Sequence, residues 1–97
     1  MAALFQIPIR PVPAAFTTRS LANDDNGGVF TVAGAETATV PAGLTPGFNA
    51  FFNGAGALGF TASSTTVTDE RVAGATNPSC NIVCTAADTY KIIGSKA

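Results

Sequence analysis

The 97-residue chain is long enough for one small domain with a core of its own. Only 11% of its residues are charged and its net charge is −1, so it lacks the basic surface that binds nucleic acid or an anionic membrane. A small domain that diffuses freely as a monomer usually carries more charge than this. We therefore expect other subunits to cover part of its surface.

The composition favours β-structure. Thr and Val are frequent, and their branched side chains pack well on a pleated sheet, while the 10 glycines and 6 prolines suit turns. The fold class that we predict is all-β, a small antiparallel β-sandwich of the jelly-roll or immunoglobulin type. It spans residues 16–97, and residues 1–15 form an extended N-terminal arm.

The arm is apolar and rich in proline. Its prolines at positions 8, 11 and 13 fix φ, remove backbone donors and push the preceding residues into extended conformations. Such a segment is either an edge strand folded onto its own domain or an arm that docks on a neighbouring subunit. The apolar side chains that we expect to make that contact are Leu4, Phe5, Ile7 and Ile9.

No stretch approaches the ~18–20 continuous apolar residues that a membrane-spanning helix needs. The N-terminal segment has no basic start, and its prolines interrupt the apolar helix of a signal peptide. We therefore expect no membrane partner, and assembly in a cytoplasm.

Turn signals follow the arm. Residues 16–22 alternate weakly, as in a strand, and Asn26-Gly27 predicts a type I′ hairpin. The acidic and amide side chains of residues 23–26 lack the spacing of an EF-hand Ca²⁺ loop, so no metal site is predicted. Further strands are predicted at Val29–Val32 and Thr37–Val40.

Pro46-Gly47 fits the two central positions of a type II turn. The strand that follows, Phe48–Asn53, has aromatic side chains on both faces because successive residues of a strand alternate. Phe48 and Phe52 share one face and Phe51 lies on the other. Phe51 is therefore our candidate for an intersubunit contact.

Gly54–Gly59 is predicted to be a tight hairpin. Its letters match the pattern G-x-G-x-x-G, but a dinucleotide site needs a βαβ unit around these glycines. Strand-like runs flank them here. No cofactor is predicted.

The dense charge cluster Asp69-Glu70-Arg71 does not predict a catalytic site. Neighbouring side chains of a strand point to opposite faces, and the chain contains no His that could assist a carboxylate. We predict that the protein is not an enzyme and that these residues form a solvated loop or an intersubunit salt bridge.

Cys80–Thr85 and Thr89–Gly94 predict a closing hairpin. Cys80 and Cys84 would share a face about 13 Å apart, at ~3.3 Å per residue, whereas a disulfide needs Cα atoms within ~7 Å. Two thiols without a His also make a poor metal site. We expect buried free thiols that pack as small hydrophobic groups.

Three segments together resemble a small β-sandwich domain of tailed-bacteriophage virion proteins: Asn-Asp-Asp-Asn-Gly, T-A-T-V-P-A-G-L-T-P-G-F and D-T-Y-K-I-I-G-S-K-A. The resemblance covers about residues 17–97. In that family the domain is found on capsid surfaces and at the ends of tail fibres, commonly as a trimer.

The resemblance implies a structural protein of the virion, assembled in the host cytoplasm. A fibre domain ends a long chain, whereas this one follows a short arm, so the expected function is that of a capsid decoration (cement) protein. It would sit on the capsid surface as a homotrimer, bind between major capsid subunits through the arm, and stabilise the head. The alternative is a tail or fibre-tip module that binds a host receptor or glycan through Asn49, Asn53 and Tyr90.

Overall fold

The computed structural model describes residues 13–97. The arm residues Leu4, Phe5, Ile7 and Ile9 lie outside the described residues. The described chain is all-β, as predicted: it contains strands and two short 3₁₀ turns, and no α-helix lies within residues 13–97.

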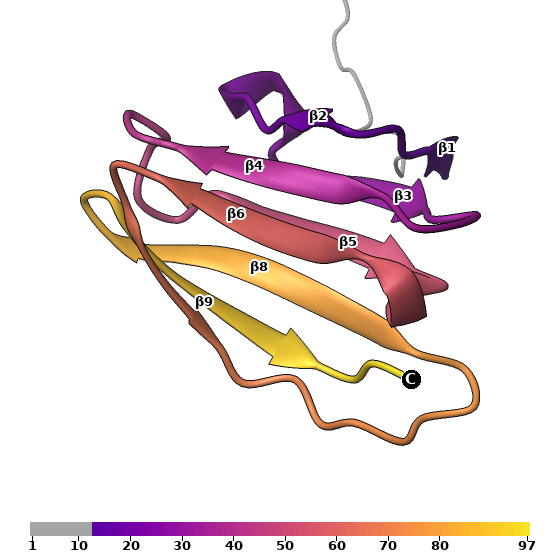
Figure 1. The fold of residues 1–97 in the computed structure, drawn as a ribbon. Helices are drawn as coiled ribbons and strands as arrows, with labels where there is room; N and C mark the ends of the chain where they lie inside the picture. The colour runs from indigo at the N-terminus through magenta and orange to yellow at the C-terminus, as the bar shows by residue number, and fades with distance from the viewer. Residues whose placement is uncertain (1–12) are drawn as a thin grey trace, which may run out of the picture.

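The strands form two facing sheets (Figure 1). The six-stranded sheet has the order β1 (Ala14–Ala15), β3 (Gly28–Thr31), β5 (Asn49–Asn53), β8 (Ser79–Ala86), β9 (Thr89–Gly94) and β7 (Thr66–Asp69). The three-stranded sheet has the order β2 (Arg19–Ser20), β4 (Thr37–Pro41) and β6 (Gly59–Ser63).

From β1 to β6 the chain alternates between the two sheets. Each strand therefore pairs with the strand two places along, and all of these pairs are parallel, namely β1–β3, β3–β5, β2–β4 and β4–β6. We call residues 14–63 the parallel coils, because this winding is that of a short β-solenoid. Within the described residues, only β5–β8 and β8–β9 are antiparallel. The predicted antiparallel arrangement therefore holds only for β8 and its two neighbours, and β7 pairs with β9 in parallel.

Two predicted hairpins are crossovers between the sheets. Asn23–Asp25 forms the 3₁₀ turn η1, and Gly27, with φ of 74°, leads from β2 in one sheet to β3 in the other. Ala55–Ala57 forms the 3₁₀ turn η2, so β6 runs parallel to β4 instead of returning along β5. The glycines reverse the chain in each case, as expected, but across the sandwich instead of within one sheet.

The type II turn at Pro46-Gly47 is present. Gly47 has φ of 93°, and the Phe48 N–H donates a hydrogen bond to the Thr45 carbonyl at 2.9 Å. A positive φ of this size favours glycine because it has no Cβ.

The segment assigned to the arm ends in a short strand. Ala14 and Ala15 form β1, paired with Phe30 and Thr31. Phe16, which follows them, is buried in the core. The sheet therefore begins inside the segment that was assigned to the arm.

Phenylalanines fill the centre of the parallel coils. Phe30 stacks on Phe52 with ring centroids 5.4 Å apart, and Phe16 meets both rings edge-on at 5.8 and 5.2 Å. Phe60 of the opposite sheet meets Phe52 edge-on at 5.7 Å. Edge-on and offset ring pairs of this kind add to the free energy gained by burial alone.

The closing hairpin is confirmed. β8 and β9 pair antiparallel, and we call them the antiparallel ribbon. Cys80 and Cys84 are buried on its inner face as free thiols. Tyr90 is 1% exposed, and its hydroxyl donates a hydrogen bond to the Pro41 carbonyl at 3.1 Å, which joins the ribbon to the three-stranded sheet.

Candidate interaction surfaces

The two acidic residues of the charge cluster do not act together. Asp69 binds Arg71, with 2.8 Å between Oδ2 and Nη2, whereas Glu70 lies 3.7 Å from the ammonium of Lys91. The hydrogen bond from Arg71 holds the pKa of Asp69 below its usual value. Each carboxylate is therefore engaged with its own cation.

Arg71 clamps the two sheets together at one edge. Its side chain is only 6% exposed, lies 5.1 Å from the centroid of the Phe60 ring, and donates from Nη1 to the Leu58 carbonyl at 2.8 Å. A buried guanidinium needs such partners because desolvation of an unpaired charge is costly. The cluster thus has a structural role that the sequence pattern did not reveal.

Burial raises the pKa of the Cys80 thiol to about 11, so it is protonated near neutral pH. The protonated thiol is a weak nucleophile and a weak metal ligand. Among residues 13–97, no group of three or more Cys, Asp or Glu side chains is placed to hold a metal ion.

The six-stranded sheet has an outer face that points away from the three-stranded sheet (Figure 1). We define it by the row Val29, Phe51, Asn81 and Ile93, which are paired in register across β3, β5, β8 and β9. Their neighbours in sequence point inward to the core, for example Phe52 and Ile92. The row therefore presents three apolar side chains and one amide to the outside.

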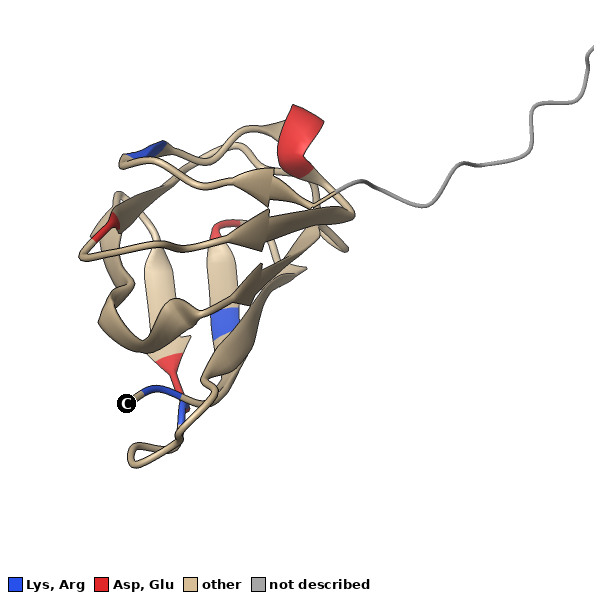
Figure 2. Ribbon diagram, turned by 90° about the vertical axis from the view of Figure 1, so that its right-hand side faces the viewer, with Lys and Arg blue, Asp and Glu red and all other residues tan. Residues whose placement is uncertain are grey.

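This outer face is nearly free of charge. Lys91 lies opposite Val83, two residues along β9 from Ile93, and pairs with Glu70, and the other charged groups lie mainly at the ends and edges of the sheets (Figure 2). Ile93 is 46% exposed, and Val72, beside the end of β9, is 69% exposed. Phe51 is half-buried at the centre of the face, and its predicted intersubunit contact stays a prediction.

A shallow hollow lies at the end of the sandwich where η2 crosses over. It measures about 460 Å³, and its polar side chains are Asn53, Thr76 and Asn77. Tyr90 does not belong to it, because its ring is buried beneath the three-stranded sheet. The expectation that Tyr90 lines a surface site is therefore wrong.

Sequence reasoning missed the coils, although a signal was present. The pattern F-x-x-A-G-A-x-x-x-T occurs at residues 30–39 and again at residues 52–61. The two copies stack in register, with Phe30 opposite Phe52 and Thr39 opposite Thr61. Internal repeats of this kind are typical of solenoids.

No helix among the described residues is long and apolar enough to cross a lipid bilayer. No protein-family profile, curated protein or solved structure matches this chain.

Proposed function

We propose that this protein is a structural component of a tailed-bacteriophage virion, most specifically a capsid decoration (cement) protein. The observation that carries the proposal is the outer face of the six-stranded sheet, which has few charged side chains and has Phe51 at its centre. Ile93 on this face and Val72 beside the end of β9 are exposed large apolar side chains, and exposed apolar patches are typical of interaction sites. The resemblance of residues 17–97 to phage virion domains supplies the identity of the assembly.

In this proposal the sheet face joins copies of the chain into a homotrimer, and the arm holds each copy to the major capsid protein. Burial of apolar surface contributes about 25 cal/mol per Å² before the costs of association. A modest contact repeated over a whole shell stabilises the head against internal pressure. No catalytic step or cofactor is needed for this function.

Binding of purified protein to empty capsids, followed by co-sedimentation, tests the role of the arm. Deletion of residues 2–13 removes Leu4, Phe5, Ile7 and Ile9 but leaves the core residues in place. We expect loss of binding with an unchanged circular dichroism spectrum. Full binding by the deleted chain would contradict the role of the arm.

The role of the outer face is tested by Phe51→Lys, which places a charge at its centre. The matched control is Ala35→Lys, in an exposed loop between β3 and β4. We expect only Phe51→Lys to reduce the trimer to monomers in analytical ultracentrifugation. If the two variants have the same oligomeric state, the outer face is not the trimer interface.

The hollow at η2 favours one second candidate, a tail or fibre-tip module that binds a host glycan. Amide and hydroxyl side chains such as those of Asn53, Thr76 and Asn77 can bind sugar hydroxyl groups. The double variant Asn53→Ala and Asn77→Ala should then abolish adsorption to host cells. Under the decoration proposal the same variant leaves adsorption unchanged.

A further inference from the structure

The N-terminal arm joins the six-stranded sheet beside the row of side chains that defines the outer face. β1 is an edge strand of this sheet, and Ala14 pairs in parallel with Phe30. One residue earlier in the same register, Pro13 lies at the level of Val29. Val29 is the first member of the row, which continues across the sheet to Ile93. The arm therefore meets the sheet at one end of this row.

The arm has one apolar side. Alternate side chains of an extended segment point the same way, so Phe5, Ile7 and Ile9 share one side. The opposite side carries Gln6 and Arg10. An extended arm with this pattern can lay three apolar side chains on a sheet and keep its polar side chains in water.

The spacing of the arm matches the spacing of the row. Neighbouring strands lie ~4.8 Å apart, so Phe51 lies ~10 Å and Ile93 ~19 Å from β1. An extended chain advances ~3.3 Å per residue, so from Pro13 it covers ~13 Å to Ile9 and ~20 Å to Ile7. Ile9 can therefore lie beside Phe51, and Ile7 beside Ile93.

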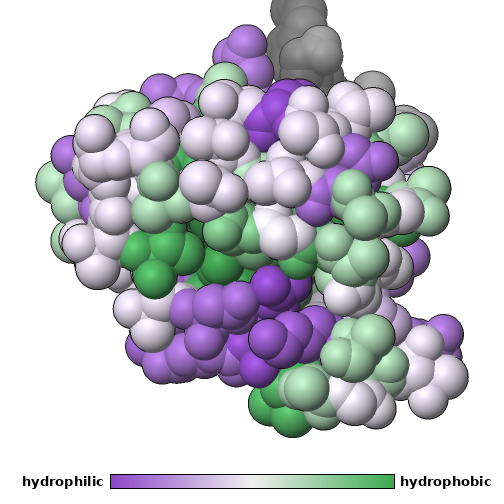
Figure 3. Space-filling model, in the orientation of Figure 1, coloured by the Kyte–Doolittle hydropathy of each residue, from purple (hydrophilic) through white to green (hydrophobic). Residues whose placement is uncertain are grey.

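The three-stranded sheet offers the arm no comparable row. Ala38 and Val40 of β4 are buried, so Thr39 between them points outward, in register with Thr61 of β6. Figure 3 shows mostly pale surface, of intermediate hydropathy, where β4 and β6 lie in Figure 1. Covering hydroxyl groups with an apolar arm costs free energy when they lose water and gain no partner. The outer face of the six-stranded sheet therefore fits the arm better.

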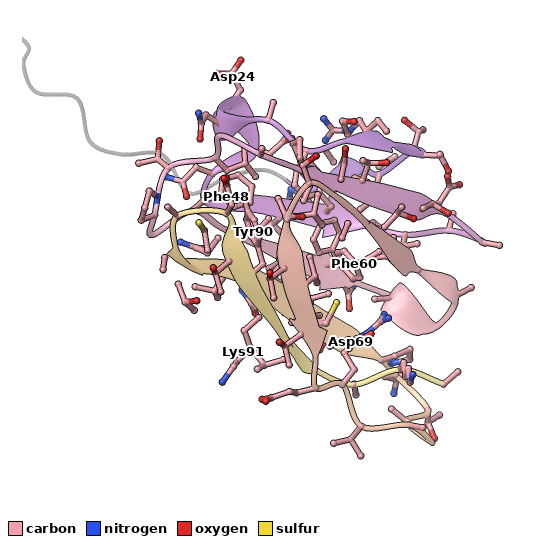
Figure 4. All side chains as sticks on the ribbon, turned by 60° about the vertical axis from the view of Figure 1, so that its left-hand side comes forward. Asp24, Phe48, Phe60, Asp69, Tyr90 and Lys91 are labelled. Atoms are coloured by element: carbon pink, nitrogen blue, oxygen red, sulfur yellow. The ribbon has the colours of Figure 1, made fainter. Side chains whose placement is uncertain are left out.

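The charged side chains of the outer face leave the row clear. Lys91 points away from the ribbons in Figure 4 and lies two residues before Ile93 in β9. Its ammonium lies 3.7 Å from the carboxylate of Glu70, and both side chains are about half exposed. The charged residue of the arm, Arg10, lies on the side that faces water. An arm across the row therefore buries no charge.

We propose that residues 5–9 of the arm lie across the outer face of their own chain and compete there with other copies of the chain. The inference rests on the proposed function, because it concerns the regulation of the face that forms the trimer. Attachment at the end of the row favours the arm's own face, since a short linker gives an effective concentration on the order of millimolar.

The competition couples self-association to capsid binding. In a free subunit the arm covers Phe51 and Ile93 and weakens the contact between copies. Major capsid protein that binds the arm removes this competitor from the outer face. The trimer therefore forms more readily on the shell than in solution, because the two binding events are thermodynamically linked.

The first measurement uses methyl NMR spectra of the full-length chain at concentrations where it is monomeric. Ile9→Asp places a charge on the apolar side of the arm, and the matched control Gln6→Asp places the same charge on the opposite side. We expect Ile9→Asp to shift the methyl signals of Val29 and Ile93, and Gln6→Asp to leave them unchanged. Identical signals in the wild type and Ile9→Asp overturn the proposal.

The second measurement is sedimentation velocity over a range of concentrations. An arm that occupies about nine outer faces in ten weakens apparent self-association about ten-fold, so Ile9→Asp should associate at about ten-fold lower concentration than the wild type. Gln6→Asp should keep the wild-type midpoint. Weaker association of Ile9→Asp would show that the arm joins copies to one another, which overturns the proposal.

The two measurements separate this inference from the proposed function. If the methyl signals shift but no variant associates, the arm contact stands and the trimer of the proposed function fails. If the wild type associates through Phe51 but the methyl signals do not shift, the trimer stands and the arm contact fails.

Discussion

The parallel coils and the antiparallel ribbon share one sheet but are built differently. The coils consist of strands of two to five residues that cross from sheet to sheet, and their interior is a group of phenylalanines. The ribbon consists of strands of eight and six residues joined by a tight turn, and its interior holds two thiols, isoleucines and Tyr90. The short strands of the coils are stabilised by stacking of one coil on the next. The ribbon is stabilised by a long ladder of backbone hydrogen bonds between two strands that are adjacent in sequence.

Two contacts connect the regions across the sandwich. Tyr90 of the ribbon donates to the Pro41 carbonyl of β4, and Arg71 donates to the Leu58 carbonyl just before β6. If these contacts and the shared core make the protein one cooperative unit, a destabilising substitution in either region lowers the midpoint of a single unfolding transition. Two separate transitions would show that the regions fold independently.

The largest expected effect comes from the coils. Phe30→Ala removes a ring that contacts Phe16 and Phe52, and we expect a loss of about 4 kcal/mol in the free energy of unfolding. Phe30→Leu keeps most of the volume and should cost about 1 kcal/mol. Urea unfolding measures both, and equal losses would contradict the packing account.

The corresponding change in the ribbon is Gly94→Ala. Gly94 has φ of 126°, and an added Cβ would clash with the Ser79 carbonyl oxygen and would lie 2.7 Å from the Cys80 Cα. We expect a loss of about 3 kcal/mol, since both the strain and the clash involve backbone. Gly34→Ala is the control, because nothing lies within 4 Å of its Cβ and its φ is not positive. Equal melting temperatures for the two variants would contradict the predicted strain and clash at Gly94.

Alkaline pH should destabilise the folded protein through the Cys80 thiol of the ribbon. Burial raises the pKa of Cys80 to about 11 from 9.0, so the folded thiol stays neutral where the unfolded one ionises. The free energy of unfolding therefore keeps its full value below pH 9. It decreases by about 2 kcal/mol as the pH rises toward 11, because the unfolded thiol ionises first. Cys80→Ala should flatten the dependence of the unfolding free energy on pH between 9 and 10. An unchanged slope would exclude Cys80 as the cause.

The smallest expected effect tests the connection between the regions. Tyr90→Phe leaves the Pro41 carbonyl without its donor and should cost about 1 kcal/mol. Burial, with a contribution from the Cys84 thiol, raises the pKa of Tyr90 to about 12, so this variant should also lose less stability than the wild type above pH 10. Guanidinium unfolding at pH 8 and pH 11 measures both effects.

The sequence predicted the ribbon better than the coils for a physical reason. Cys80, Ile82 and Cys84 alternate within one strand, and the return strand follows after a short turn, so all the information is local. The strands at Val29, Thr37 and Phe48 were also placed, and Phe48 and Phe52 lie on one buried face, as their alternation predicted. Their partners were not, because a glycine turn specifies that the chain reverses but not whether it stays in one sheet.

The candidate surfaces were predictable only in part. The position of Phe51 on the second face follows from alternation, and the structure places it at the centre of the uncovered sheet. The burial of Tyr90 and the clamp formed by Arg71 depend on packing between segments that are far apart in sequence.

The copy number of this chain relative to the major capsid protein in purified phage particles tests the decoration proposal most directly. The account predicts a ratio within a few-fold of one to one, since a decoration protein covers the whole head. A handful of copies per particle would contradict it and move the protein to the tail, where the hollow at η2 becomes the leading candidate site.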